Sequence, residues 1–320
     1  MPPLPRRSLF TFGPVTALLA AGCSAPTGAA SPAGSPTAGT RTVESVAGPV
    51  EVPASVNSVV ATEGRRDLDI ALALGLPLVG FPRDGETPDA VPRFDAELRA
   101  AEAAGAEQLF LRNEINLEAI AAVDPDLVLG RDEDLAELPE LTQIAAVLPL
   151  GQTGTNRTWQ DDLAVVAQAT GTQAAAEEVL TRYAGRLEEV RAAHADALGA
   201  RVLMAATSED GGLSLSGSRL AVRVLSDLGA VFSPAMAAVV PDGEADYSQE
   251  NVARATADAD LVVLVANDAE ARDLVASPTY RDVPALAAGR YVVVDKYVNE
   301  GGPLTAVSFL DTLDELYAAL

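Results

Sequence analysis

Hydrophobic residues in the first half of the chain form short continuous runs separated by amphipathic stretches. The runs that predict β-strands lie at residues 56–62, 78–81, 108–111, 126–130 and 144–148. The amphipathic stretches at 67–74 and 116–123 predict helices. Continuous apolar strands that alternate with helices are typical of a parallel sheet covered on both faces. We therefore expect residues 41–157 to form an N-terminal α/β lobe.

The hydrophobic spacing changes to a purely helical one between residues 158 and 198. Apolar positions recur every three or four residues at Val179, Leu180, Tyr183, Leu187 and Val190. This spacing predicts one face of an amphipathic helix. Gly171 interrupts the helical region, which is expected to resume at Ala174 and run to about Leu198. The pattern predicts a stiff helical connector.

The strand and helix alternation returns after residue 199. Strands are predicted at residues 201–205, 260–265 and 291–295, and helices at 218–228, at 304–320 and after the capping residue Ser248. Residues 199–320 are therefore expected to form a C-terminal lobe. The predicted fold class is α/β, with two lobes that each hold a mostly parallel sheet flanked by helices, joined by a long connector helix.

A short pattern occurs once in each predicted lobe. Glu118 lies two residues after the cap residue Asn116 and eight residues before an Asp-Leu-Val strand start. Glu250 lies two residues after Ser248 and ten residues before a second Asp-Leu-Val. An acid in the first turn of a helix is favoured by the helix dipole, which explains each glutamate singly. The repeat itself favours two similar lobes with a ligand cleft between them.

The N-terminus has the features of an export signal. Two arginines, Arg6 and Arg7, precede an apolar stretch at residues 9–21, which is shorter than a membrane-spanning helix. Leu-Ala-Ala-Gly then precedes Cys23, the only cysteine, and this pattern predicts cleavage after residue 22 and lipidation, including palmitate, of Cys23. Residues 1–22 are the predicted lipoprotein signal peptide. An ordinary secretory signal is the alternative, and the arginine pair leaves Sec and twin-arginine export both open.

Small residues fill the segment after the cysteine. Residues 23–40 are therefore predicted to be the lipidated cysteine and a flexible tether that holds the folded part at the extracytoplasmic face of the cell membrane.

Composition narrows the function of the folded part. The 320 residues are 48% hydrophobic and carry a formal net charge of −24, which argues against a nucleic-acid partner. The chain has one His, one Cys and a single lysine, Lys296, so a cysteine cluster for zinc or an internal disulfide is excluded. No phosphate-binding, dinucleotide-binding, zinc-protease or serine-hydrolase motif is present, and His194 lies in the charged connector. The sequence therefore does not predict an enzyme, a resident cofactor or a metal site.

Several motifs in a fixed order resemble one family. They are the lipobox and tether, Val50-x-Val-Pro53, Ala71-Leu-Ala-Leu-Gly-Leu-Pro77, Asn116-Leu-Glu-Ala-Ile120, Asp124-Pro-Asp-Leu-Val128, Gly289-Arg-Tyr-Val-Val-Val-Asp295 and Gly301-Gly-Pro-Leu304. In this order they resemble the substrate-binding lipoproteins of ATP-binding-cassette transporters, in the helix-linked branch that captures ferric siderophores, haem or cobalamin. The resemblance runs from about residue 41 to the C-terminus. It implies a monomeric, lipid-anchored receptor that binds an Fe(III)-siderophore complex between its lobes and delivers it to an ABC permease dimer.

Basic and aromatic side chains near the predicted strand ends are the candidate ligand contacts, because ligands of parallel sheets meet the loops at those ends. They are Arg65, Arg66, Arg83, Arg131, Arg219, Lys296 and Tyr297, with Trp159 at the start of the connector. Arginine suits the carboxylate or catecholate oxygens of an anionic ferric chelate. For each, a local ion pair or a packing role is the alternative. The resemblance further implies that Glu118 and Glu250 dock the two lobes onto the permease.

Other cargoes and classes stay open. Haem iron usually takes a His, Tyr, Met or Cys ligand, which here would come from Tyr247, Tyr280, Tyr297 or Met236. Cobalamin is a further cargo for the same fold. A surface-anchored hydrolase or signalling lipoprotein is the alternative from a different class. The sequence does not specify the siderophore type, the cognate permease or the extent of lobe closure.

Overall fold

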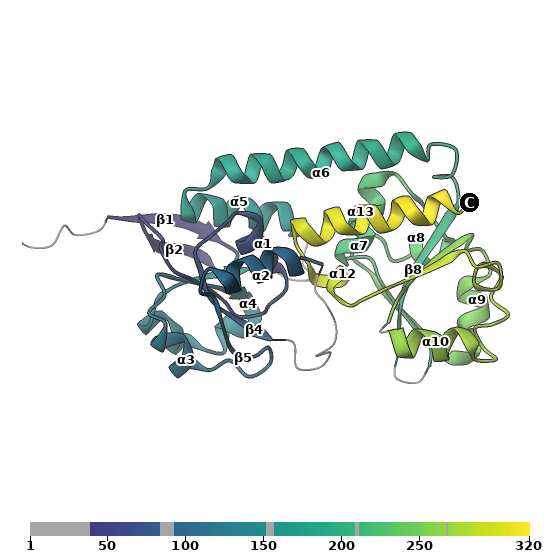
Figure 1. Cartoon of the computed structure of the whole chain (residues 1–320). Helices are drawn as coiled ribbons and strands as arrows, with labels where there is room; N and C mark the ends of the chain where they lie inside the picture. Colours follow the sequence, from purple (N-terminus) through teal and green to yellow (C-terminus); the bar gives the residue numbers. More distant parts are fainter. Residues whose placement is uncertain (1–38, 84–92, 152–156, 209–210, 267) are drawn as a thin grey trace, which may run out of the picture. The chain divides into compact units, whose positions relative to one another are not determined.

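The first element among the described residues is a β-hairpin that precedes the predicted lobe strands (Figure 1). In the computed structural model of the chain, β1 (Thr40–Ser45) pairs antiparallel with β2 (Gly48–Pro53), and Val43 and Val52 are buried. The hairpin contacts α5 and β7, whose bounds follow below. The structure describes residues 39–83, 93–151, 157–208, 211–266 and 268–320. Cys23 and the predicted signal peptide lie outside the described residues, and β1 begins at the last residue assigned to the tether.

The first large sheet is entirely parallel, as the continuous apolar runs predicted. Its strand order is β5-β4-β3-β6-β7. The strands are β3 (Val59–Ala61), β4 (Leu78–Arg83), β5 (Glu107–Leu111), β6 (Leu127–Arg131) and β7 (Ala146–Leu150). Val59 and Leu127 pack into the main core, whereas Val60 and Val128 pack into a second, smaller core. Both faces of this sheet are therefore covered.

Helices follow the strands of this sheet in turn. They are α1 (Arg66–Ala73), α2 (Asp95–Ala103), α3 (Leu117–Ala122), α4 (Asp132–Ala136) and the 3-10 helix η1 (Pro139–Gln143). Ile120, Leu135 and Leu141, from α3, α4 and η1, fill the smaller core. Ile70 of α1 lies in the main core on the other face.

The connector consists of two helices. Helix α5 (Trp159–Thr170) starts with a capping box between Thr158 and Asp161 and ends at Gly171, whose φ of 78° suits glycine. Helix α6 (Gln173–Ala193) packs against α5, α7 and α13. It ends five residues before the predicted Leu198, because the backbone leaves helical geometry at His194.

The second sheet is mixed. Its order is β11-β9-β8-β12-β13, and β10 also pairs with β8. The parallel strands are β8 (Arg201–Thr207), β10 (Val231–Phe232), β12 (Leu261–Val265) and β13 (Tyr291–Val294), and the antiparallel ones are β9 (Leu213–Ser216) and β11 (Glu244–Tyr247). The two sheets thus confirm the predicted α/β class, although the exact lobe boundaries stay a prediction.

The remaining helices belong to the C-terminal part. They are α7 (Leu220–Leu228), α8 (Pro234–Ala237), η2 (Gln249–Asn251), α9 (Val252–Thr256), α10 (Asp268–Ala276), α11 (Pro284–Ala287), α12 (Tyr297–Glu300) and α13 (Pro303–Ala318). Helix α13 runs beside α6 (Figure 1) and also contacts α1 and α7.

A buried carboxylate fixes the start of α13. Asp69 of α1 accepts hydrogen bonds from the N–H groups of Gly302 (2.9 Å), Leu304 (2.8 Å) and Thr305 (3.0 Å), and from the Thr305 hydroxyl (2.7 Å). The first N–H groups of a helix have no partner within the helix, so an acceptor from α1 satisfies them. A Cβ at Gly302 would come 3.0 Å from Cγ of Asp69, which explains a glycine there. Helix α13 is thereby tied to α1.

Candidate functional site

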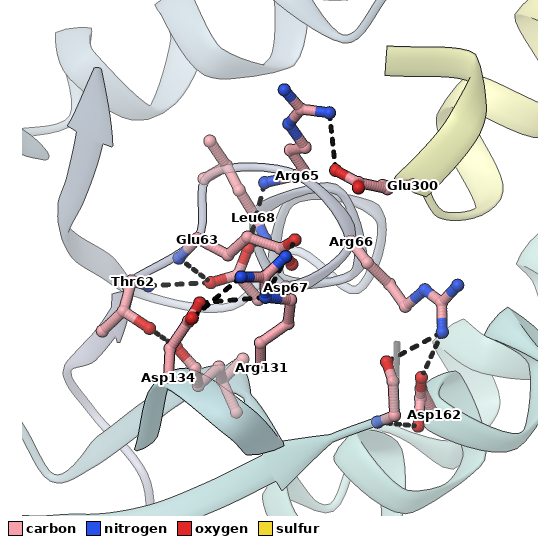
Figure 2. Close-up of polar contacts among 12 residues, drawn as sticks. Thr62, Glu63, Arg65, Arg66, Asp67, Leu68, Arg131, Asp134, Asp162 and Glu300 are labelled. Carbon is pink, nitrogen blue, oxygen red and sulfur yellow. Dashed lines mark hydrogen bonds and ion pairs between the residues drawn. The ribbon is translucent and has the colours of Figure 1, made fainter. Parts of the chain in front are cut away.

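The loop that leaves β3 is held by one buried aspartate (Figure 2). Asp67 accepts hydrogen bonds from the backbone N–H groups of Thr62 (2.7 Å), Glu63 (2.8 Å), Arg65 (3.1 Å) and Leu68 (2.7 Å). These bonds fix the backbone from the carboxyl end of β3 into the first turn of α1. The side chains of Glu63 and Arg65 therefore start from a rigid loop at the strand ends.

Arg65 pairs with a glutamate from the C-terminal part of the chain. Its Nη1 lies 2.6 Å from Oε2 of Glu300, at the end of α12. The guanidinium carbon lies 5.5 Å from the centre of the Tyr297 ring, a cation–π contact. Tyr297 is buried and meets Phe94 edge to face. The Arg65 side chain is 4% exposed and that of Glu300 is 28% exposed, so the carboxylate is the member of the pair nearer to water.

Glu63 and Arg131 form a second pair beside the first. Glu63 is buried, and its Oε1 lies 3.8 Å from Nε of Arg131, the last residue of β6. Asp134 holds the Arg131 guanidinium through two hydrogen bonds of 3.0 and 2.8 Å, which raise the pKa of Arg131. Burial, followed by the charges of Asp67 and Glu300, raises the pKa of Glu63 to about 8 despite Arg131 and Arg65. Glu63 therefore keeps its proton at neutral pH in most molecules.

The charge of Glu300 also acts on Arg219. Arg219 precedes α7, and its Nη1 is buried without a hydrogen-bond partner among the residues that the structure describes. Burial lowers the pKa of Arg219, and the charges of Glu300, Glu244 and Asp246 oppose this shift. Glu300 also acts on Arg131. The charge of Glu300 thus acts on three of the predicted ligand residues, Arg65, Arg131 and Arg219. We term these three arginines and Glu300 the arginine cluster.

Two other predicted ligand residues lie at strand ends. Arg83 is the last residue of β4 and its side chain is exposed, whereas residues 84–92 after it lie outside the described part. Lys296 is half-buried between β13 and α12, next to Tyr297. The strand-end expectation therefore holds for their positions, and their contact with a ligand stays a prediction.

A sequence comparison decides the family. Residues 66–298, more than two thirds of the chain, match the family model described as periplasmic binding protein. The chain belongs to the periplasmic binding protein family. It is therefore a binding protein and not an enzyme. No curated protein sequence matches this periplasmic binding protein at a significant level.

Solved structures of the same fold bind siderophores. The triscatecholate siderophore-binding protein FeuA of Bacillus subtilis, complexed with ferri-bacillibactin, superposes with a TM-score of 0.70 at 18% identity, covering 87% of this chain and 98% of FeuA. Staphylococcus aureus SirA, complexed with staphyloferrin B, gives 0.69 at 19% identity, with 87% and 98% coverage. The siderophore periplasmic binding protein from the fuscachelin gene cluster of Thermobifida fusca gives 0.64 at 23% identity, with 84% and 99% coverage. At these identities the likeness shows the fold.

Arg66 and Trp159 are buried in the interior of this periplasmic binding protein. Nη1 of Arg66 donates to the carbonyl of Gly151 (2.9 Å) and to Oδ2 of Asp162 (3.0 Å), and Asp162 is fully buried. Trp159 is 2% exposed and meets Tyr183 edge to face. These contacts favour the packing role that the sequence left open for both. Their contact with a ligand stays a prediction that this packing does not support.

The two predicted docking glutamates are both exposed, but their local structures differ. Glu118 lies in the first turn of α3, where Asn116 accepts a hydrogen bond from the N–H of Ala119 as predicted. Glu250 lies in the 3-10 helix η2, and the side chain of Ser248 does not cap it but instead accepts from Asn251. Ser248 thus holds the N-cap position of η2, but the expected side-chain cap is absent, and α9 starts only at Val252.

The acidic members of the site were missed by sequence reasoning. Glu63 lies two residues after the end of β3, and Glu300 precedes the Gly-Gly-Pro start of α13. The sequence holds 46 acidic residues, so neither position stood out. A strand-end search that included acids as well as arginines would have found Glu63.

Two further features are absent from the described residues. None of the helices among them is long and apolar enough to cross a membrane. No three His, Cys, Asp or Glu side chains among them gather as a metal site would require.

Proposed function

We propose that this protein is a monomeric receptor that binds a ferric siderophore, an Fe(III) chelate, between its two lobes and delivers it to an ABC permease dimer. The observation that carries the proposal is the arginine cluster near the strand ends, where Arg65 pairs with Glu300 and the charge of Glu300 also acts on Arg131 and Arg219. Arginine forks suit the anionic oxygens of such chelates. The siderophore-bound neighbours of the same fold support the same class of cargo.

The candidate ligand contacts are Arg65, Arg131 and Arg219, with Arg83, Lys296 and Tyr297 around them. Arg219 in particular suits a negatively charged ligand, because its Nη1 is buried without a hydrogen-bond partner among the described residues and a desolvated guanidinium is stabilised by a counter-charge. A chelate with carboxylate or catecholate donors provides one.

Haem is a weaker candidate on the side chains present. Met236 is buried in the core, and the hydroxyl of Tyr280 donates to the carbonyl of Gly212 at 2.9 Å. Nε2 of His194 lies 2.6 Å from Asp314, on the connector side. Tyr297 is buried under Arg65. These contacts favour a siderophore over haem as the cargo.

The cargo is tested by calorimetric titration of the full-length protein. The panel holds ferric catecholate, hydroxamate and citrate-type siderophores, haemin and cobalamin. We expect saturable submicromolar binding of one anionic ferric siderophore class. Selective binding of haemin or cobalamin would make that compound the cargo in place of a siderophore. Binding of none of these compounds would overturn the receptor function.

The exposed glutamates Glu118 and Glu250 are the proposed permease contacts. Replacing both with alanine should abolish uptake in cells while ligand affinity stays unchanged, because neither lies in the arginine cluster. Glu178→Ala, at an exposed position of α6, is the matched control. A loss of ligand affinity in the double variant would contradict the docking role.

The lipid anchor at Cys23 is the last part of the proposal. The lipobox pattern supports it. We expect Cys23→Ser to lose palmitate labelling and to release the protein from the membrane fraction. Retained labelling would contradict lipidation at this residue.

A further inference from the structure

Glu300 is the partner of one of the arginines that we assign to the ligand. Its Oε2 lies 2.6 Å from Nη1 of Arg65, and its charge also acts on Arg131 and Arg219. A carboxylate on a guanidinium fork makes the same charge-assisted hydrogen bond that a carboxylate or catecholate oxygen of a ferric chelate would make. One residue of the chain therefore competes for the arginines that we assign to the ligand.

The two members of this pair differ in how firmly they are held. Arg65 leaves a loop fixed by Asp67, lies over the Tyr297 ring and is 4% exposed. Glu300 is the last residue of the four-residue helix α12, next to Gly301 and Gly302, and is 28% exposed. The arginine is thus the fixed member, and the glutamate is the member that water reaches and that can leave.

Burial favours an exchange of charges at Arg65. The Arg65 side chain is 4% exposed, so departure of the Glu300 carboxylate is unfavourable, and a negative group that takes its place offsets this cost. An anionic chelate provides such a group. A neutral chelate would bring Arg65 no negative charge in exchange for that of Glu300.

We propose that Glu300 is an internal placeholder for the anionic group of the ligand: it pairs with Arg65 when no ligand is bound and is displaced when an anionic ferric chelate binds. This inference rests on the proposed function and narrows its cargo to chelates with net negative charge. Glu300 then lowers the affinity for anionic chelates, which must displace it from Arg65.

The test is the isosteric variant Glu300→Gln in the full-length protein. Two probes are titrated by calorimetry: ferri-bacillibactin, a triscatecholate in which three doubly charged catecholates outweigh Fe(III), and ferrichrome, in which three singly charged hydroxamates balance it. Loss of a partly exposed competing pair should tighten binding of ferri-bacillibactin by about five- to tenfold. Ferrichrome binding should change by less than about twofold, because it supplies no charge to exchange.

Two controls separate displacement from a general change in charge. Glu189→Gln on α6 makes the same change in net charge and should leave both affinities unchanged. Adding Arg65→Gln to Glu300→Gln should remove the gain, because the contested guanidinium is then absent. Thermal melts confirm that each variant folds, and Glu300→Ala should give the same sign as Glu300→Gln.

The outcomes distinguish a failure of the placeholder role from a failure of the receptor function. Tight binding of ferri-bacillibactin to the wild type, with equal or weaker binding to Glu300→Gln, would overturn the placeholder role and leave the receptor function intact. Failure of the wild type and the variant to bind any ferric siderophore would overturn the proposed function and the placeholder with it.

Discussion

Arg65 and Arg66 are neighbours in sequence but have different surroundings (Figure 2). Arg65 points to Glu300, whose side chain is 28% exposed, whereas Arg66 points to Asp162, whose side chain is 0% exposed. Successive residues at the start of a helix project in different directions, so the two arginines lie on different sides of α1. The difference teaches how to separate the two roles. A buried arginine whose partner is also fully buried, such as Arg66, holds the fold together, whereas one whose partner is exposed to water, such as Arg65, is available to a ligand.

The largest effect is expected on the Arg66 side of this comparison. Asp162 pairs with Arg66 and with Arg157, and it accepts the N–H of Gly151. Asp162→Ala leaves a buried guanidinium without its partner, which should lower the free energy of unfolding by about 3 to 5 kcal/mol. Chemical denaturation measures this change, with Glu178→Ala on the exposed face of α6 as the control. A loss below about 1 kcal/mol would place Asp162 outside the framework.

The intermediate effect concerns Glu63 and depends on pH. Its pKa is raised from 4.5 to about 8 by burial, then by the charges of Asp67 and Glu300. A raised carboxyl pKa means that the folded state binds the proton more tightly than the unfolded state, so stability is lost as pH rises from about 4.5 to about 8. A glutamine side chain at this position does not titrate. Glu63→Gln should therefore be more stable than the wild type by a margin that grows across this range, at most about 1.4 kcal/mol per pH unit.

Thermal melts from pH 5 to pH 8.5 check this prediction, with Glu178→Gln as a variant whose difference from wild type should stay flat. A constant difference between Glu63→Gln and the wild type would show that Glu63 titrates normally.

The smallest effect on stability is expected on the Arg65 side. Glu300→Gln removes a charge but keeps a side-chain oxygen that can accept from Arg65, and water reaches this position, so the loss of stability should be smaller than that of Asp162→Ala. The same denaturation series should therefore place Glu300→Gln close to the wild type and far from Asp162→Ala. Equal losses in the two variants would erase the distinction between a framework arginine and a ligand arginine.

The sequence predicted the parts of the fold that local pattern determines. Parallel strands such as β6 and β12 are buried on both faces, so each reads as a continuous apolar run. The antiparallel strand β11 (Glu244–Tyr247) and the hairpin strand β1 were missed, because β11 has no buried residue and β1 buries only Val43, so neither reads as a continuous apolar run.

The site was predictable in position but not in pairing. Arg65 and Arg131 follow strand ends, a rule that needs only the local sequence. The partner of Arg65 lies 235 residues away and that of Arg66 lies 96 residues away, so only the tertiary packing could assign them. The same packing separates Arg66 and Trp159 from the candidates that remain near Glu300.

The most direct test of the central claim is a crystal structure of the protein saturated with the ferric siderophore that binds most tightly. We expect the guanidinium of Arg65 to contact a chelate oxygen and to have left Glu300, while Arg66 still pairs with Asp162. A chelate bound elsewhere, with the Arg65–Glu300 pair intact, would contradict this claim.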